Sequence, residues 1–179
     1  EYSQKIGIEF LSTPFDSESL FFLSETLDLQ TLKIPSGEIT NLPLLVEYGK
    51  TKKSLILSTG MSTLGEIEEA LGAIAFGLIG SSESASVESI KRSYFSREGY
   101  AALYKKVTLL HCTTEYPAPL EAINLNSMLT MRSAFNLSVG YSDHSSGWTV
   151  PIAATALGAE VIEKHFTLSR SLEGPDHLA

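Results

Sequence analysis

The chain has little cysteine, little positive charge and no long apolar run. With Cys112 as its single cysteine it cannot form an internal disulfide, which fits a reducing cytoplasm. No apolar stretch approaches the roughly 18 residues that a membrane span needs, and no secretory signal opens the sequence. Its 13 Lys and Arg are outnumbered by 21 Asp and Glu, a net charge of −8, which gives no general attraction for nucleic acid. We therefore expect a cytoplasmic protein that binds neither membranes nor nucleic acid.

At 179 residues, with 43% apolar and 19% charged side chains, the chain has the length and composition of one globular domain. Short apolar runs alternate with longer stretches in which apolar residues recur every three or four positions. Strands are expected at residues 6–11, 29–34, 54–57, 107–112, 137–141 and 161–166. Helices are expected at residues 16–27, 40–48, 63–79, 90–104, 120–135 and 149–157, with a serine-rich loop at 80–89.

This alternation gives about six βα units, which predict a parallel α/β sheet with right-handed crossovers. The strands are apolar along most of their length, as in sheets covered on both faces. An open doubly wound sheet and a (β/α)8 TIM barrel both fit. A complete barrel needs about 250 residues, so a barrel would be incomplete here. The first residue is not methionine and the last follows a loop motif, so we expect a fragment of a longer protein.

Polar side chains follow almost every expected strand. One such cluster could simply cap the next helix. Carboxyl ends of parallel strands face the ligand in α/β folds, however, so six clusters on one rim predict an active site. The clusters contain Ser12 and Thr13; Lys33, Ser36 and Glu38; Ser58 and Thr59; His111, Thr113, Thr114 and Tyr116; Ser142, Asp143 and His144; and Glu163, Lys164 and His165.

Strand alternation allows His111, His144 and His165 to converge at a barrel mouth from three strands. Imidazoles without cysteine partners indicate a divalent metal bound by nitrogen and oxygen. We expect His144 and His165 to bind it. For His111, which shares a face with Leu109, a hydrogen-bonded packing role below the site is an equal alternative. Cys112 alternates outward, toward the helices, and is interpreted as a small buried residue.

Lys33 and Glu38 each allow two interpretations. Lys33 interrupts an apolar run, so its ammonium either reaches the surface along the apolar stem or neutralises a carboxylate or phosphate. Glu38 precedes a helix, where it either interacts with the helix dipole or binds the hydroxyls of a sugar.

Six segments together resemble the N-acetylneuraminate (sialic acid) synthase family, which includes legionaminate and pseudaminate synthases. The resemblance covers nearly the whole chain apart from the serine-rich stretch. Residues 111–117 and the insertion near Gly80 look more like the sialic and legionaminic branches than the pseudaminic one. The six segments are residues 33–38, 57–61, 111–117, 140–144, 163–167 and 174–177.

The resemblance implies a (β/α)8 barrel whose central and C-terminal part is residues 1–179, with the first strands and a C-terminal antifreeze-like domain outside them. It implies a homodimeric transferase that condenses phosphoenolpyruvate with an N-acetylated amino-sugar aldehyde and water. The aldehyde would be N-acetylmannosamine or a diacetamido-trideoxy hexose, and the products a nonulosonic (sialic-type) acid and phosphate. The divalent cofactor would be Mn²⁺ or Mg²⁺.

The resemblance also implies roles for individual residues. Lys33, Glu38, His144 and His165 would be catalytic, with the two histidines as metal ligands and no Schiff base on Lys33. The predicted substrate contacts are Ser12 and Thr13 near phosphate; Lys33, Ser36, Ser58 and Ser142 on phosphoenolpyruvate; Glu38, Tyr116 and Asp176 near the sugar; and Thr114.

Two other functions compete with this prediction. A two-histidine metal site with nearby carboxylates also suits a different metal-dependent aldolase or a hydrolase on a TIM barrel, which would remain active without phosphoenolpyruvate. A non-catalytic paralogue acting as a partner subunit would not bind metal.

Overall fold

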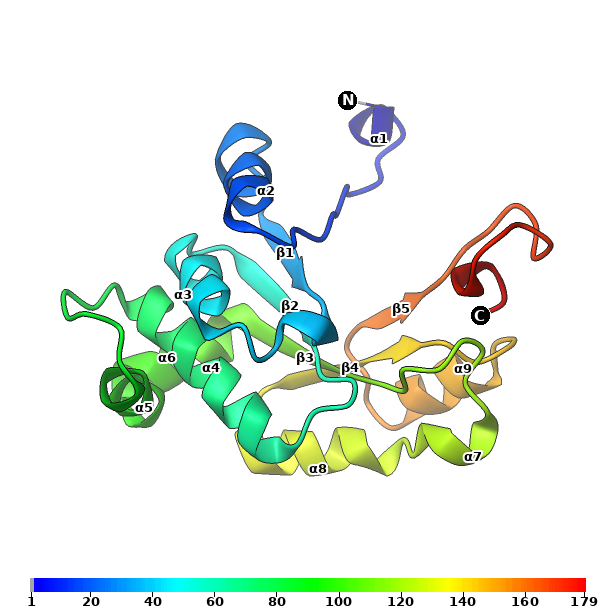
Figure 1. Ribbon diagram of the computed structural model, residues 1–179. Coiled ribbons are helices and arrows are strands. Elements are labelled where there is room, and N and C mark those ends of the chain that lie inside the picture. Colours follow the sequence, from blue (N-terminus) through cyan, green and yellow to red (C-terminus); the bar gives the residue numbers. More distant parts are fainter. Residues whose placement is uncertain (1) are drawn as a thin grey trace.

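The computed structural model describes residues 2–179, which build a five-stranded parallel sheet in the order β1-β2-β3-β4-β5. The strands are β1 (Thr31–Ile34), β2 (Ser54–Ser58), β3 (Val107–Cys112), β4 (Ser138–Asp143) and β5 (Ile162–Lys164). The sheet curls, with β1 and β5 as its edges (Figure 1). Because strand order follows chain order without reversal, the sheet is a half-barrel, and the doubly wound alternative is wrong.

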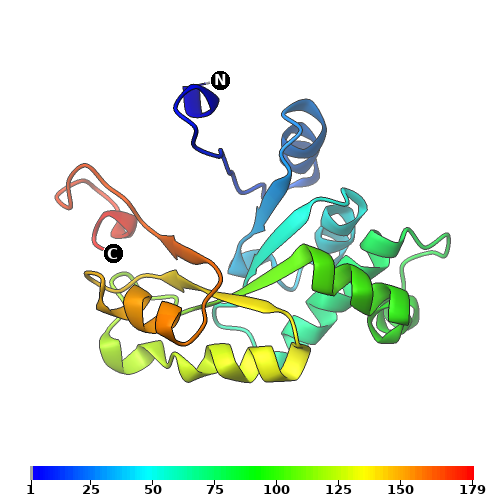
Figure 2. The same cartoon turned by 180° about the vertical axis from the view of Figure 1, so that it is seen from behind.

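Helices cover the outer side of the curled sheet, as Figures 1 and 2 show. No helix within residues 2–179 is long and apolar enough to span a bilayer. The α-helices are α1 (Tyr2–Lys5), α2 (Ser17–Phe21), α3 (Leu42–Lys50), α4 (Leu64–Ile79), α5 (Val87–Phe95), α6 (Arg97–Lys106), α7 (Leu120–Ile123), α8 (Asn126–Phe135) and α9 (Thr149–Ala156). A π-helical turn η1 (Phe22–Thr26) extends α2, and 3-10 turns form η2 (Ser36–Glu38) and η3 (Pro175–His177).

The strand expected at residues 6–11 is not formed, so the described residues, 2–179, contain five strands where six were predicted. Ile6, Ile8 and Phe10 are about half exposed, at 51%, 61% and 49%. The segment is apolar enough for a strand, but a strand also needs a neighbour for its backbone groups, and β1 pairs only with β2 among residues 2–179. The other five predicted strands are confirmed, with ends shifted by a few residues.

Two predicted helices are each split by a local signal. The helix expected at 90–104 breaks at Ser96, whose extended backbone lets its hydroxyl accept a hydrogen bond from Gly99 N and begin α6. The helix expected at 120–135 breaks at Asn124, whose left-handed backbone ends α7.

Thr63 and Glu66 form a reciprocal capping box at the start of α4.

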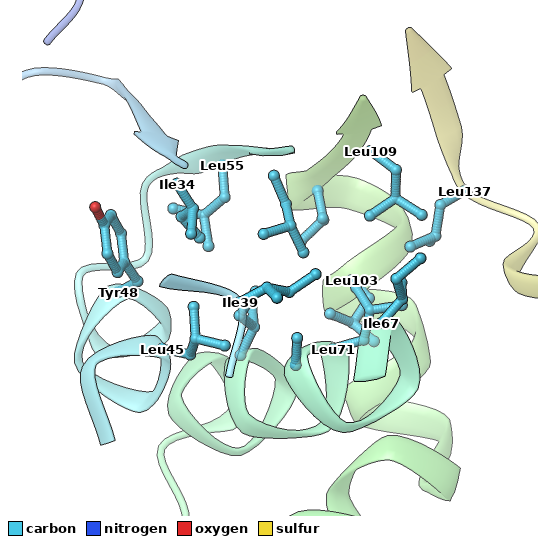
Figure 3. Packing of buried hydrophobic residues seen from close by; sticks show 14 of the residues in the cluster. Ile34, Ile39, Leu45, Tyr48, Leu55, Ile67, Leu71, Leu103, Leu109 and Leu137 are labelled. Atoms are coloured by element: carbon cyan, nitrogen blue, oxygen red, sulfur yellow. The ribbon is translucent and has the colours of Figure 1, made fainter. Parts of the chain in front are cut away.

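The main core lies between the outer face of the sheet and the helices (Figure 3). Ile34, Leu55 and Leu109 point from the strands toward Leu45 and Leu71 on α3 and α4. Each fully buried side chain of this kind contributes about 1.5–3 kcal/mol relative to exposure. This layer therefore holds the strands in place and fixes which of their residues face inward.

Helices α3 and α4 approach each other backbone to backbone at two glycines. A Cβ added to Gly49 would lie 2.3 Å from the carbonyl oxygen of Ile74, and one added to Gly77 would lie 2.3 Å from that of Val46. No side chain larger than hydrogen fits at either position without moving a helix.

Candidate active site

The inner face of the sheet carries a row of polar side chains. Cys112 on β3 pairs in register with Ser142 on β4, which pairs with Glu163 on β5. Lys33 on β1 and Ser58 on β2 face the same way. Together with residues from the loops after the strands they enclose a cavity of about 330 Å³. Its lining is Thr13, Lys33, Pro35, Ser36, Ser58, Cys112, Tyr116, Ser142, His144, Glu163, Lys164 and His165.

Lys33 is fixed inside this cavity by partners from other strands. It is 7% exposed, and its Nζ donates to Ser58 Oγ at 2.8 Å. The same Nζ lies 3.3 Å from Glu163 Oε1, which also accepts from Ser142 Oγ at 2.7 Å. The ammonium therefore does not reach the surface, and its charge is directed into the cavity. On the outer side of the strand, Tyr48 Oη shares its proton between the carbonyl oxygens of Pro14 at 2.6 Å and Lys33 at 3.0 Å.

His144 and His165 lie together at one side of the cavity, with ring centroids 5.3 Å apart. The ring of Tyr116 packs against both, at 4.1 Å from His144 and edge-on at 5.5 Å from His165. His144 Nδ1 lies 2.6 Å from the carbonyl oxygen of Thr113. A proton on Nδ1 satisfies this contact and leaves the Nε2 lone pair free for a metal. Burial lowers the pKa of His144, which favours the neutral ring that a metal requires.

The donor set fits a divalent ion that keeps open coordination positions. Within residues 2–179 no group of three or more His, Cys, Asp or Glu side chains converges closely enough to form a complete metal site. The two imidazoles would thus leave the remaining positions to water or substrate oxygens, which is the pattern of catalytic sites rather than structural ones.

A buried ion pair lies next to the two histidines. Lys164 Nζ contacts Asp143 Oδ2 at 2.7 Å and also donates to the carbonyl oxygen of Ser145 at 2.7 Å. Asp143 Oδ1 accepts from both the backbone nitrogen and the hydroxyl of Ser145, at 3.0 and 2.7 Å. Asp143 and Ser145 are fully buried, and both carboxylate oxygens of Asp143 accept hydrogen bonds within the cluster.

The cavity has a different charge balance from the chain as a whole. The chain carries a net charge of −8, whereas two lysines and a single glutamate line the cavity. Lys33 pairs with Glu163 and Lys164 pairs with Asp143, so the charges at the cavity are balanced, and an anionic ligand would not meet the negative excess of the chain as a whole. Hydroxyl groups from three strands or strand ends (Ser36, Ser58 and Ser142) add hydrogen-bonding capacity.

Eight of the twelve residues predicted as site residues line this cavity, and four do not. The eight are Thr13, Lys33, Ser36, Ser58, Tyr116, Ser142, His144 and His165. Ser12 precedes the lining residue Thr13 without joining the lining. Glu38 lies on η2, where its carboxylate accepts from Asn41 Nδ2 at 2.8 Å. The functional roles predicted for these residues stay predictions.

Thr114 and Asp176 lie at the margin of the cavity. Thr114 Oγ1 covers Gly60, since a Cβ on that glycine would lie 2.5 Å from it. Asp176, on η3, is near Tyr116: burial is the main cause that raises the pKa of the Tyr116 hydroxyl, and the negative charges around it, including Asp176, add to this.

The orientations expected for His111 and Cys112 are wrong. His111 shares the outer face with Val107 and Leu109, and its Nε2 lies 2.6 Å from the carbonyl oxygen of Ile123 on α7. It does not reach the barrel mouth, and the alternative expected for it, a hydrogen-bonded packing role, is confirmed. Cys112, one residue on, faces the cavity, and burial raises the pKa of its thiol. The alternation along β3 was predicted, but the two faces were exchanged.

Pro35, Cys112, Glu163 and Lys164 line the cavity without having been assigned a catalytic, metal-binding or substrate-binding role, although Glu163 and Lys164 belong to a predicted polar cluster. For Glu163 the sequence held a usable signal, because it stands two residues from His165 and thus on the same strand face. Lys164 gave no such signal. It alternates away from Glu163 and His165, and enters the site through its long side chain at the end of β5.

Comparison with known proteins identifies the family. The model of the NeuB family matches residues 1–179. The chain belongs to the NeuB family. An N,N'-diacetyllegionaminic acid synthase from Campylobacter jejuni is 50% identical to this NeuB chain over 178 residues, which is 99% of this chain and 46% of the relative. One from Legionella pneumophila is 44% identical over 179 residues, 100% and 44% of the two chains.

A solved structure gives the same assignment for the fold. The N-acetylneuraminic acid (sialic acid) synthetase from Leptospira borgpetersenii superposes with a TM-score of 0.76 at 36% identity, covering 98% of this chain and 52% of that one. The NeuB chain thus spans about half the length of the relatives it matches. These matches confirm the family resemblance seen in the sequence.

Proposed function

We propose that this NeuB chain forms the catalytic centre of a synthase that condenses phosphoenolpyruvate with an N-acetylated amino-sugar aldehyde and water. The products are a nonulosonic acid and phosphate. The observation that carries the proposal is the cavity itself, whose lining brings together a fixed lysine, three serine hydroxyls and two imidazoles. The names of the relatives support the same reaction class. The proposal includes further barrel strands and an antifreeze-like domain elsewhere in the protein, and a cytoplasmic homodimer.

Phosphoenolpyruvate would bind on the side of Lys33. The ammonium offers one positive charge to a carboxylate or phosphate, and Ser36, Ser58 and Ser142 offer hydroxyls around it. The hydroxyl of Ser142 would exchange its bond to Glu163 for one to the ligand. Holding the anion on several strands restricts its orientation before reaction, which is worth several kcal/mol of the barrel's catalytic effect. Lys33 acts here as a fixed charge and not as a nucleophile.

The sugar aldehyde would lie on the side of His144 and His165, which are the proposed ligands of Mn²⁺ or Mg²⁺. The bound metal supplies Lewis-acid polarisation of the aldehyde oxygen. Tyr116 packs on both rings and so holds them at the wall of the cavity. Asp176 and Glu38 remain proposed contacts of the sugar hydroxyls.

The reaction balances with one water molecule. C3 of phosphoenolpyruvate forms a bond to the aldehyde carbon, whose oxygen takes a proton. Water adds to C2 and loses a proton, and the C2 adduct then collapses to the ketone as phosphate leaves. For proton transfer between these steps we propose Glu163, a carboxylate of the cavity whose Oε1 lies beside Lys33 Nζ and Ser142 Oγ.

We propose a diacetamido-trideoxy hexose of the legionaminic type as the preferred sugar. Support comes from the two diacetyllegionaminic acid synthases, which are 50% and 44% identical to this chain. N-acetylmannosamine is the matched alternative, because it carries the same aldehyde but a different pattern of acetamido groups.

The test is phosphate release from phosphoenolpyruvate by the full-length protein. We expect release that requires the sugar, stops after chelation, returns with Mn²⁺, and is faster with the diacetamido sugar than with N-acetylmannosamine. A folded protein that releases no phosphate with either sugar would overturn the reaction. Activity toward an aldehyde without phosphoenolpyruvate would favour the other aldolase or hydrolase instead.

A further inference from the structure

The ion pair of Asp143 and Lys164 lies at the last register pair between β4 and β5. The proposed metal ligands His144 and His165 immediately follow the ends of these two strands. Paired sheet structure ends at this point on β5, which is only three residues long. The relative position of the two imidazoles thus depends on contacts beyond the backbone ladder.

The ion pair holds the chain on both sides of His144. Asp143 precedes the histidine and Ser145 follows it, and Lys164 Nζ binds Asp143 Oδ2 and the carbonyl oxygen of Ser145, each at 2.7 Å. Ser145 in turn donates twice to Asp143 Oδ1. Lys164 at the end of β5 therefore holds the three residues 143–145 at the end of β4, with His144 in the middle.

Burial of this pair argues against a role in stability alone. Asp143 is fully buried and the side chain of Lys164 is 13% exposed. Desolvating two charges costs about as much as their attraction returns, and apolar replacements of such pairs are often neutral or stabilising. A directional contact of this kind can hold a particular geometry, and the adjacent geometry here is that of two proposed metal ligands.

We propose that Asp143 and Lys164 are positioning residues that set the spacing and orientation of the His144 and His165 imidazoles for a divalent cation. The proposal rests on the proposed function of those histidines as metal ligands. Neither Asp143 nor Lys164 binds the cation itself. Each acts through the neighbouring histidine, so that loss of the pair weakens metal binding.

The experiment compares Lys164→Met with Lys53→Met in the full-length protein. Each removes a lysine charge while keeping the stem, and Lys53 is the matched control because it pairs with Asp28 at 2.6 Å outside the cavity. Isothermal titration gives the Kd for Mn²⁺ without turnover, and the visible spectrum of the Co²⁺ form reports its coordination geometry. Lys164→Arg, which keeps the charge, tests rescue.

We expect Lys164→Met to raise the Mn²⁺ Kd by about tenfold to a hundredfold, as for other groups that orient metal ligands, and to change the Co²⁺ spectrum. Lys164→Arg should recover most of the affinity, and Lys53→Met should match wild type. If Lys164→Met does not fold, as judged by circular dichroism, Ser145→Ala provides a milder change that removes only one hydroxyl contact to Asp143 and should raise the Kd severalfold.

An unchanged Kd and spectrum in the folded variants would overturn the positioning role. If such variants still released phosphate with sugar, the proposed function would stand without it. If the wild type released phosphate but bound no Mn²⁺, the positioning role would fail while the condensation survived. Absence of phosphate release combined with the expected loss of affinity would instead reject the reaction and keep the metal-positioning pair.

Discussion

The two faces of the sheet are built by opposite means from the same strands. Outward-facing residues such as Leu55 and Leu109 are apolar and are held by packing against helices. Inward-facing residues such as Lys33 and Ser58 are polar and are held by hydrogen bonds to other side chains. The packing energy of the outer face is spread over many contacts, whereas the proposed function of the inner face depends on a few side chains. Substitutions on the outer face should therefore change stability, and those on the inner face should change activity.

The largest effect is expected on the inner face, for Lys33→Met. Loss of the ammonium removes the charge proposed to hold phosphoenolpyruvate, so kcat/KM should fall by about a hundredfold to a thousandfold. The urea unfolding midpoint should change little, because Glu163, whose side chain is 40% exposed, can be solvated once its partner is gone. Steady-state phosphate release and urea unfolding measure the two quantities. A loss of stability as large as the loss of activity would contradict the division between the faces.

The opposite result, a loss of stability with unchanged activity, is expected for Gly49→Ala on the outer side of the sheet. Its new Cβ would lie 2.3 Å from the carbonyl oxygen of Ile74, so α3 and α4 must separate at a cost of about 1–3 kcal/mol. Urea unfolding measures this cost, and kcat per folded molecule should stay unchanged. The control is Gly65→Ala, where the nearest heavy atom would be Thr63 Oγ1 at 3.9 Å. That change should not destabilise the protein, since alanine is the better helix former.

The sequence predicted these faces in part. Apolar runs located five of the strands, and alternation placed Ser142 with His144 and Glu163 with His165. Alternation alone does not say which face is inner. On β3 the helices contact Val107 and Leu109, and only that contact shows that His111 faces outward and Cys112 inward. The contact of Lys33 with Glu163 joins the two edge strands of the sheet, which no local pattern encodes.

The smallest effect is expected at His111, which carries an ionisable group into the packed face. Burial lowers its pKa below the ordinary 6.5, and a hydrogen bond to Ile123 opposes the shift. The unfolded chain therefore takes up a proton before the folded one. Stability that is present above about pH 6.5 is lost as the pH falls toward the lowered folded pKa. His111→Gln keeps a donor for Ile123 but cannot titrate.

We therefore expect the free energy of unfolding of His111→Gln to decrease less than that of wild type between about pH 7 and pH 5. Urea unfolding at several pH values measures the difference between the two proteins, in which the titration of all other groups cancels. Parallel pH profiles would show that His111 is protonated equally in both states, and that the outer face tolerates a charge.

Inside the cavity, Glu163 competes with any anionic ligand for the ammonium of Lys33. Glu163 already holds the ammonium at 3.3 Å with help from Ser142, so an arriving anion exchanges one carboxylate for another instead of meeting a bare cation. The net affinity for the anion is then the difference between the attraction of Lys33 to the anion and its attraction to Glu163. In the proposed reaction, such an arrangement would disfavour weakly charged or singly coordinating anions, and it would favour the release of phosphate, because Glu163 can pair with Lys33 again. Glu163 would then contribute to turnover as well as hold Lys33 in place.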